Sequence, residues 1–249
     1  MKFEKRILAG GRATLYRGDC LELLREGAFG KIGAIATDPP YGIGYQHGGG
    51  RGIRGVARGK YGAPKTDPIH GDDAPFDPSP WIEAAPTTPV RQQHYGGELI
   101  LCLWGADNFR KALPDGGTML AWDKHLGRAS DDSFADCEWA WVGRKVKREV
   151  FRWMWKGVCT RKSPLDAAPG GRHFRRVHVS QKPVELMRWC IDKVRPLPGL
   201  PVLDPYMGSG STGVAALSLG MSFTGCEIDP EHFEAACLRI EAAHAQGAY

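Results

Sequence analysis

Short apolar runs recur along much of the chain at spacings that suit a layered α/β protein. Residues 32–37, 99–104, 118–122, 201–204 and 222–227 each have the length and composition of a buried strand. The first of these runs ends in Asp-Pro-Pro-Tyr. We expect it to be a buried parallel strand with a loop at its carboxyl end.

Helical patterns lie between and after these runs. Residues 183–194 form an amphipathic stretch, 211–219 form a small-residue stretch that follows a glycine-rich turn, and 106–113 predict a short helix. Asp229 followed by a proline is typical of an N-cap and a first helical residue, so a last helix is expected after it.

Two segments depart from these patterns. Residues 42–80 are rich in Gly, Pro and Arg and have no apolar period, which predicts a long loop, either functional or a linker. Residues 123–180 combine tryptophans with basic residues, and Trp153 and Trp155 alternate as in a strand. Both a nucleic-acid surface and an ordinary core with a solvated basic face remain open for the second segment.

The composition sets limits on these interpretations. A chain of 249 residues is long enough for one full α/β domain with a small insertion. Its net charge of +5 permits a polyanionic partner without requiring one. The seven cysteines form no C-x-x-C pair, which argues against a disulfide framework and against a metal site, and suits a reducing cytoplasm. We expect neither a signal peptide nor a transmembrane helix.

Positive charge is concentrated in one part of the chain. Between Arg144 and Lys182 there are twelve Lys or Arg residues, against only Glu149 and Asp166. This local excess is twice that of the whole chain, and aromatic side chains are interleaved with it. The pattern is typical of a surface that neutralises phosphates.

The segment 202–213, VLDPYMGSGSTG, predicts a strand, a glycine-rich turn and a helix. Gly208 and Gly210 allow a tight turn with close approach to a ligand, and Glu227 ends the next strand, where α/β folds place a carboxylate for ribose hydroxyls. A P-loop is excluded because no lysine follows Gly210, and the glycines do not have dinucleotide-binding spacing.

Together these segments resemble the amino-methyltransferases of DNA, in the permuted β-type order with the catalytic motif first. Residues 38–41 match the family's catalytic tetrapeptide, 204–212 match its cofactor loop with Tyr206 in place of Phe, and 178–187 match its His-Pro-Thr-Gln-Lys-Pro helix entry. The segment 17–20 resembles the family's Gly-Asp-Cys. Trp104-Gly105 and Trp122-Asp123-Lys124 also resemble stretches common in phage-type members.

The resemblance implies an S-adenosylmethionine-dependent enzyme acting on double-stranded DNA. Its fold would be Rossmann-like and α/β, with a mostly parallel sheet, helices on both faces and an inserted target-recognition region. The catalytic half is expected at 1–122, including the 42–80 loop. The target-recognition region is expected at 123–177 and the cofactor-binding half at 178–249.

The catalytic tetrapeptide suits methylation of an exocyclic amine. Asp38 and the Pro39 carbonyl can accept the two N–H groups of the amine, Pro40 stiffens the turn, and Tyr41 offers a face for a flipped base. In the family an Asp in the first position accompanies adenine, so N6 of adenine is expected. Cytosine N4, RNA, a protein amide and a catalytically inactive DNA-binding homologue remain alternatives.

The resemblance also assigns site residues. The expected cofactor-binding residues are Asp19, Cys20, Asp38, Ser180, Gln181, Lys182, Asp204, Pro205, Tyr206, Met207, Gly208, Ser209, Gly210, Ser211, Thr212, Glu227, Ile228 and Asp229. The basic residues expected to contact DNA are Arg51, Arg54, Arg144, Lys145, Lys147, Arg148, Arg152, Lys156, Arg161, Lys162, Arg172, Arg175 and Arg176. A homodimer and a cognate restriction endonuclease are left open.

Overall fold

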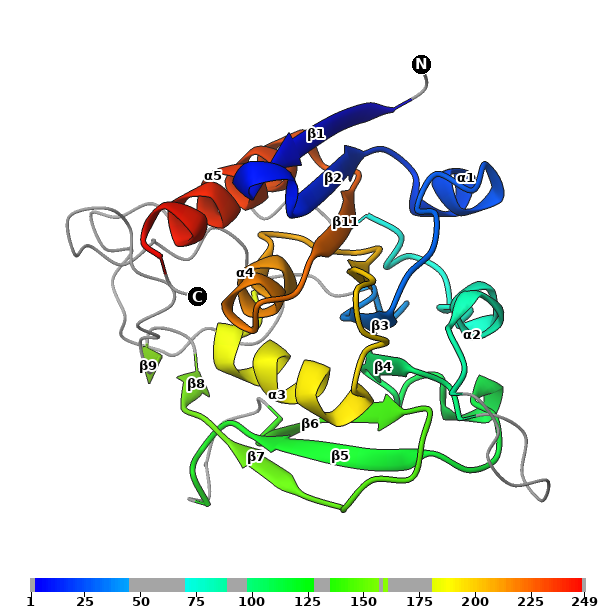
Figure 1. The fold of residues 1–249 in the computed structure, drawn as a ribbon. Coiled ribbons are helices and arrows are strands. Elements are labelled where there is room, and N and C mark those ends of the chain that lie inside the picture. Colours follow the sequence, from blue (N-terminus) through cyan, green and yellow to red (C-terminus); the bar gives the residue numbers. More distant parts are fainter. Residues whose placement is uncertain are drawn as a thin grey trace.

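The computed structural model describes residues 3–44, 70–88, 98–127, 135–156, 159–160 and 181–247. In this part of the chain a nine-stranded sheet runs through the molecule (Figure 1). Its spatial order is β1 (Glu4–Leu8), β2 (Ala13–Arg17), β11 (Phe223–Glu227), β10 (Val202–Asp204), β3 (Ala34–Thr37), β4 (Leu101–Trp104), β6 (Cys137–Val142), β5 (Thr118–Asp123) and β7 (Val150–Arg152).

Most neighbouring strands in this sheet are parallel. From β2 to β4 all the pairings are parallel, and β5 pairs with β7 in the same sense. The edge strand β1 and the inserted strand β6 are antiparallel to their neighbours. Strands β8 (Trp155–Lys156) and β9 (Cys159–Thr160) form a separate two-stranded ribbon.

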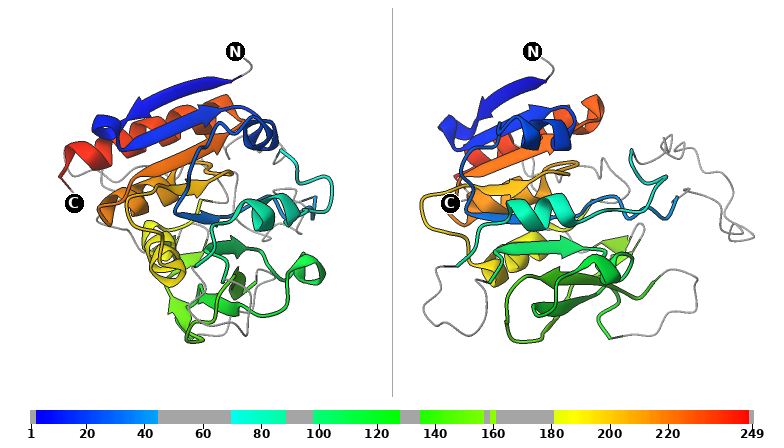
Figure 2. Two further views of the ribbon diagram at one scale, coloured as in Figure 1. Left: turned by 45° about the vertical axis from the view of Figure 1, so that its right-hand side comes forward. Right: turned by 90° about the vertical axis from the view of Figure 1, so that its right-hand side faces the viewer.

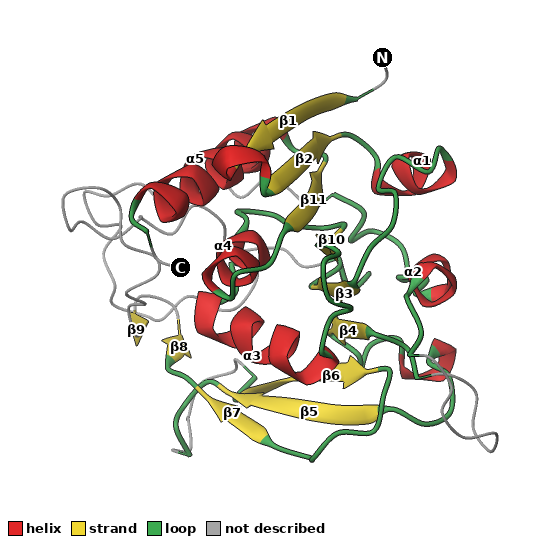
Figure 3. Cartoon of the chain, in the orientation of Figure 1, coloured by secondary structure: helices red, strands yellow, loops and turns green. Residues whose placement is uncertain are grey.

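Helices cover both faces of the sheet (Figures 1 and 2). The helices α3 (Val184–Val194), α4 (Ser211–Ser218) and α5 (Pro230–Ala245) pack on one face, and α1 (Cys20–Arg25) and α2 (Ser79–Ala84) on the other. Short 3-10 turns lie at Ala9–Gly11 and Arg110–Ala112. The element colouring in Figure 3 shows the same layered arrangement, which is the predicted α/β fold.

Strand β3 shows why the continuous apolar runs predicted buried strands. Ala34 and Ala36 belong to the core under α3, α4 and α5, whereas Ile35 belongs to the core under α1 and α2. All three side chains are fully buried. Because both faces of the strand are covered, polar residues at alternate positions would be buried without partners.

The five strands predicted from apolar runs and the helices of the last third are confirmed. The runs match β3, β4, β5, β10 and β11, with β5 extending one residue further to Asp123, and the stretches 183–194 and 211–219 contain α3 and α4. At the start of α5 the Asp229 side chain accepts a hydrogen bond from the backbone N–H of His232 at 2.8 Å, and Pro230 is the first helical residue.

The short helix predicted at 106–113 is wrong, because only Arg110–Ala112 forms a single 3-10 turn. The Asn108 side chain donates to the Gly105 carbonyl at 3.1 Å, and this local bond competes with helix formation. Pro114 then follows directly and disfavours helical geometry at the residue before it.

Part of the predicted target-recognition region at 123–177 belongs to the central sheet. Strand β6 lies between β4 and β5 in the central sheet, and β7 pairs with β5. The strand expected from Trp153 to Trp155 is wrong, because β7 ends before Trp153 and β8 begins at Trp155. The Trp153 ring stacks on Phe151 with centroids 6.2 Å apart and packs against the core.

Only the two ends of the predicted 42–80 loop are described. Residues 42–44 and 70–78 contain turns and no strand, and α2 begins at Ser79, so the irregular segment ends slightly earlier than expected. Residues 45–69 lie outside the described part. Among the described helices, none has the length and apolar character needed to cross a membrane.

Candidate active site

Four carboxylates lie at one edge of the sheet, where the parallel strands end. Asp19 follows β2, Glu227 ends β11, Asp204 ends β10 and Asp38 follows β3. Open α/β sheets bind ligands outside the carboxyl ends of their strands. The arrangement brings the predicted catalytic tetrapeptide and the predicted cofactor loop to neighbouring strands of one edge.

The glycine-rich loop after β10 turns sharply into α4. Gly208 and Gly210 have φ angles of 49° and 81°, which L-residues with a side chain rarely adopt. The Gly208 N–H donates to Glu227 Oε2 at 2.9 Å, and the Asp229 N–H donates to Glu227 Oε1 at 2.9 Å. These bonds fix the Glu227 carboxylate beside the loop, as the spacing of the sequence predicts.

The loop and its carboxylate fit a nucleoside with a ribose. A Cβ added to Gly208 would meet nothing within 4 Å, so open space lies above the backbone at this point. A carboxylate has about four lone-pair positions, and the two backbone N–H groups use two of those on Glu227. Burial raises the pKa of Glu227, while the backbone N–H groups and His232 oppose that rise. The remaining positions can accept hydroxyl groups.

Asp204 joins the glycine-rich loop to β3, the strand that precedes the predicted catalytic tetrapeptide. Its carboxylate accepts hydrogen bonds from Thr37 Oγ1 at 2.6 Å, from Thr212 Oγ1 at 2.5 Å and from the Tyr206 N–H at 3.1 Å. Burial raises the pKa of Asp204 to about 7, although the Thr212 and Thr37 hydroxyls oppose the shift. Since Thr37 precedes Asp38, this carboxylate fixes the two halves of the site relative to each other.

A buried arginine on α5 supports the same loop from behind. Arg239 Nη1 donates to the Ser209 carbonyl at 2.6 Å and to Ser209 Oγ at 2.7 Å, and lies 3.3 Å from Ser211 Oγ. Ser211 Oγ in turn donates to the Lys182 carbonyl at 2.7 Å. The sequence had not indicated Arg239, since α5 contacts the loop only in the folded chain.

Tyr206, which replaces the family's usual Phe, packs edge-on against Trp81 and Phe76. Its hydroxyl accepts a hydrogen bond from Trp81 Nε1 at 3.1 Å. The extra hydroxyl therefore provides the buried Trp81 indole with an acceptor and ties the cofactor loop to α2.

The Asp38 carboxylate is held by two donors. Tyr41 Oη donates to Oδ1 at 2.5 Å, and Lys182 Nζ donates to Oδ2 at 2.6 Å. The Lys182 ammonium also lies 3.3 Å from Tyr41 Oη. Lys182 is predicted to bind cofactor. Its backbone carbonyl accepts a hydrogen bond from Ser211, directly after the glycine-rich loop, whereas its side chain donates to Asp38.

Burial and neighbouring charges have opposite effects on the pKa values of Asp38 and Lys182. Burial raises the pKa of Asp38, and the Lys182 ammonium opposes that rise. Burial by itself lowers the pKa of Lys182, but Asp38 and Glu138 outweigh it, and the pKa lies above the ordinary value. The lysine therefore stays charged and supplies the countercharge that an ionised Asp38 needs.

Glu138, on β6, is a site residue that no sequence motif indicates. Its carboxylate lies 3.1 Å from Lys182 Nζ and accepts a hydrogen bond from Lys124 Nζ at 3.1 Å. The two lysines lower the pKa of Glu138 although burial opposes them. Its place at the site depends on β6 pairing with β4, a contact that no local pattern reveals.

Other predicted cofactor residues have structural roles in this arrangement. Asp19 Oδ1 caps α1 by accepting from the N–H groups of Leu21 and Glu22, and Cys20 is buried at the start of that helix. Ile228 follows Glu227 at the same edge and is partly exposed. Their contacts with a cofactor remain predictions.

The described basic residues divide between the two edges of the sheet. Because β6 runs antiparallel to β4, its end at Val142 pairs with Cys102 near the start of β4, and its first residues lie toward the edge that carries Asp38. The segment that joins β6 to β7, with Arg144, Lys145, Lys147 and Arg148, therefore begins at the amino ends of β4 and β5, away from Asp38. Arg152 pairs with the end of β5 and lies at the catalytic edge.

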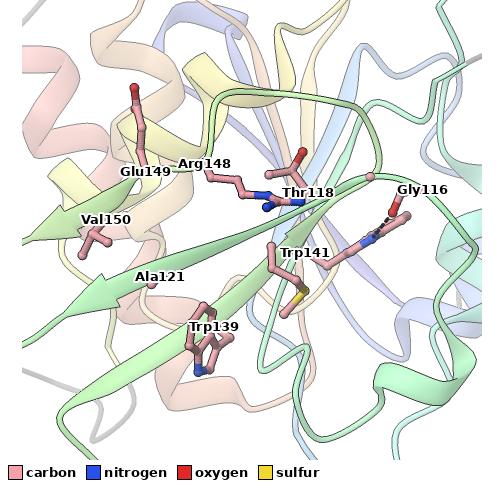
Figure 4. A pocket seen from close by; sticks show the side chains of 10 residues that line it. Gly116, Thr118, Ala121, Trp139, Trp141, Arg148, Glu149 and Val150 are labelled. Carbon is pink, nitrogen blue, oxygen red and sulfur yellow. Dashed lines mark hydrogen bonds between the residues drawn. The ribbon is translucent and has the colours of Figure 1, made fainter.

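Arg144 and Arg148 contact other parts of the protein. Arg144 Nη1 donates to the Val194 carbonyl at 3.3 Å and its Nη2 lies 3.2 Å from Glu98 Oε2. Arg148 lines a groove on the face of β5, β6 and β7, together with Trp139 and Trp141 (Figure 4). Neither position brings the side chain to the catalytic carboxylate.

The remaining predicted residues cannot be placed. Ser180, Arg51, Arg54, Arg161, Lys162, Arg172, Arg175 and Arg176 lie outside the described residues, as does the side chain of Lys156.

Comparisons with known proteins agree with this geometry. Residues 97–237, more than half of the chain, match the family model described as DNA methylase. YubD of Escherichia coli (strain K12), which is named as a methylase, is 28% identical over 231 residues, covering 91% of this chain and 89% of YubD.

Two solved methyltransferase structures have the same fold. M1.HpyAVI, solved as a complex with SAM, is 21% identical, with 92% of this chain and 98% of that chain covered and a TM-score of 0.51. The cytosine-N4-specific PvuII DNA methyltransferase is 14% identical, with 95% and 93% covered and a TM-score of 0.52.

Proposed function

The chain belongs to the DNA methylase family of N6/N4 methyltransferases, and from this premise we propose that it methylates N6 of adenine in double-stranded DNA with S-adenosylmethionine as the methyl donor. The observation that carries the proposal is the position of Asp38. Its carboxylate lies at the end of β3, and through Thr37 and Asp204 it is joined to the glycine loop and Glu227.

The cofactor would be held by the glycine-rich loop between β10 and α4 and by the carboxyl end of β11. Glu227 would accept the ribose hydroxyls, and the open space over Gly208 allows the ligand to approach the backbone closely. When bound, S-adenosylmethionine supplies a methyl group on a positively charged sulfur. Arg239 and Asp204 keep the loop in place from below.

The chain's own residues orient the target amine. The amine of adenine is a weak nucleophile because its lone pair is delocalised into the ring. Asp38 accepts one amine N–H and the Pro39 carbonyl accepts the other, which directs the nitrogen lone pair toward the methyl group. Tyr41 Oη donates to Asp38 Oδ1 at 2.5 Å. An amine N–H that binds this oxygen therefore replaces the Tyr41 hydroxyl as its hydrogen-bond donor.

The tetrapeptide also suits a flipped base. A base inside a duplex cannot reach a carboxylate at the edge of a sheet, so it must leave the stack. The Tyr41 ring provides a flat surface for it. The choice of adenine rests on the family's association of Asp in the first catalytic position with that base. We place the reaction in the cytoplasm, where its DNA substrate would be accessible.

The first test uses purified protein, methyl-labelled S-adenosylmethionine and unmethylated duplex DNA of mixed sequence, followed by digestion and separation of the nucleosides. We expect label in the N6-methyl derivative of deoxyadenosine. Label in N4-methyldeoxycytidine would overturn the base assignment. Absence of label from every DNA nucleoside, with cofactor binding established separately, would overturn DNA as the substrate.

The control for this test is Asp38→Ala. Loss of labelling on the order of 100-fold or more is expected, the cost of removing one aligned polar group from a catalytic site. Cofactor binding, measured by calorimetry, should be retained, because Glu227 and the glycine loop are unchanged. Loss of both to the same degree would contradict the role assigned to Asp38.

A further inference from the structure

Four charged side chains form an alternating series that begins at the catalytic carboxylate. Asp38 Oδ2 lies 2.6 Å from Lys182 Nζ, which lies 3.1 Å from Glu138 Oε2. Glu138 Oε1 accepts from Lys124 Nζ at 3.1 Å. The series contains two carboxylates and two ammonium groups, so its charges balance.

The series is largely shielded from water. The side chain of Lys182 is 9% exposed, and those of Asp38, Lys124 and Glu138 are 17%, 16% and 25% exposed. A charge that loses water is costly unless partners surround it. Lys182 has a flexible four-carbon stem, and its ammonium can take up many positions unless more than one acceptor fixes it.

We propose that Glu138 is a positioning residue for methyl transfer, which fixes the Lys182 ammonium so that the ammonium holds the Asp38 carboxylate in place for the target amine. The inference rests on the proposed function, because that function gives Asp38 its role. Glu138 touches neither reacting group and acts through Lys182.

The geometry favours this role over that of an ordinary ion pair. Glu138 lies near the start of β6, where it pairs with Trp122 of β5, two residues before Ala140 pairs with Trp104 at the carboxyl end of β4. A strand paired on both sides therefore carries the second carboxylate that lies within ion-pair distance of Lys182. The ammonium is held between two carboxylates, and so its distance from Asp38 is set by the sheet.

Lys124 completes the arrangement. It lies directly after β5, and its ammonium contacts Glu138 Oε1 and lies 6.0 Å from the centre of the Trp122 ring. With this partner Glu138 has a cation on each oxygen and is itself held in one position. The Trp122-Asp123-Lys124 segment, for which the proposed function gives no use, thus supports the catalytic carboxylate indirectly.

The main test compares Glu138→Gln with the unchanged protein in the labelling assay. The glutamine keeps the size of the side chain and removes its charge. We expect kcat to fall about 10- to 100-fold, the usual cost of disturbing the support of a catalytic group. The dissociation constant for S-adenosylmethionine and the KM for DNA should change less than about threefold, since the proposed role of Glu138 involves Lys182 and not a contact with either ligand.

The matched control is Glu149→Gln. Glu149 also lies between two lysines, at 2.6 Å from Lys193 and 3.2 Å from Lys147, but it is at the opposite edge of the sheet. We expect it to keep the kcat of the unchanged protein. An equal loss of kcat in both variants would show a general effect of charge, and would overturn the proposal.

A second comparison uses Lys182→Met, alone and together with Glu138→Gln. If Glu138 acts through Lys182, the double variant has the same kcat as Lys182→Met alone. Independent, multiplying losses would overturn the positioning role. Loss of cofactor binding in Glu138→Gln would also overturn it.

Nitrogen NMR of the Lys182 ammonium tests the contact between Glu138 and Lys182 without an activity assay. A lysine ammonium held by two carboxylates exchanges its protons with water slowly, and Glu138→Gln should increase the exchange rate of the Lys182 ammonium. An unchanged rate would overturn the inference. If the unchanged protein labels no DNA but the exchange rate rises as expected, the proposed function fails while the Glu138–Lys182 contact stands.

Discussion

At the scale of single residues, the position of Tyr41 depends on a glycine that directly follows β4. Gly105 follows β4 and has a φ angle of 69°. A Cβ at this position would overlap the ring of Tyr41, so the ring lies directly against the Gly105 backbone. The Trp104-Gly105 pair resembles a family stretch in the sequence, and the structure gives its glycine a reason: only glycine allows both this φ angle and this contact.

We expect Gly105→Ala to lower methyl transfer through displacement of Tyr41. The matched control is Gly27→Ala, because Gly27 has a φ angle of 66° and no atom within 4 Å of an added Cβ. Both variants should lose roughly 1 kcal/mol or more of stability from the left-handed backbone. When kcat is measured well below the melting temperatures of both variants, where both are folded, only Gly105→Ala should have a reduced kcat.

At the scale of elements, Asp204 joins three parts of the fold. It ends β10, and it accepts hydrogen bonds from Thr37 at the end of β3 and from Thr212 in the first turn of α4. Asp204 as a whole residue is 3% exposed. Replacing it would therefore disturb both the glycine loop and the strand that carries Asp38.

The pKa of Asp204 makes stability depend on pH. Burial raises this pKa from the ordinary 3.8 to about 7 in the folded protein. Between these values the folded state binds a proton that the unfolded state releases, so this group's contribution to stability is present below about pH 4 and lost as the pH rises through about 7.

We expect the free energy of unfolding to fall less between pH 5 and pH 8 in Asp204→Asn than in the unchanged protein, measured by urea denaturation. The asparagine keeps a carbonyl acceptor for one hydroxyl and does not titrate. An identical pH dependence in the two proteins would show that Asp204 has an ordinary pKa.

At the scale of the whole molecule, the basic residues that the structure describes do not all lie at one edge of the sheet. Arg152 lies at the catalytic edge, 60% exposed and 3.5 Å from Asp123, whereas Lys147 lies at the opposite edge, 82% exposed and 3.2 Å from Glu149. DNA that delivers a base to Asp38 must approach the catalytic edge. Of these two cations, therefore, Arg152 is placed to contact phosphate.

We expect Arg152→Ala to weaken DNA binding and to reduce the slope of log Kd against log salt by about 0.9, the effect of one lost phosphate contact. Lys147→Ala removes the same charge and should leave both quantities unchanged. Fluorescence anisotropy with a labelled duplex at several salt concentrations measures them. Equal effects of the two variants would contradict this placement of the DNA.

The sequence by itself determined the α/β class, five strands of the central sheet, the three helices of the last third and the two motifs. Five strands and the helices of the last third were predicted correctly because their signals are local: an apolar run for β3, an amphipathic period for α3, and an N-cap with a following proline for α5. Asp38 and Glu227 were located for a similar reason, since both stand at the ends of recognisable strands.

The tertiary structure decided which residues meet around those motifs. Glu138, Arg239 and Gly105 reach the site only because β6, α5 and β4 pack against the motif-bearing elements, and such contacts leave no local pattern. The same holds for the basic residues: their charges were visible in the sequence, but the antiparallel direction of β6 placed most of the described ones at the far edge. The hydrophobic period of a segment indicates which of its residues are buried. The order and direction of the strands decide which distant residues become neighbours.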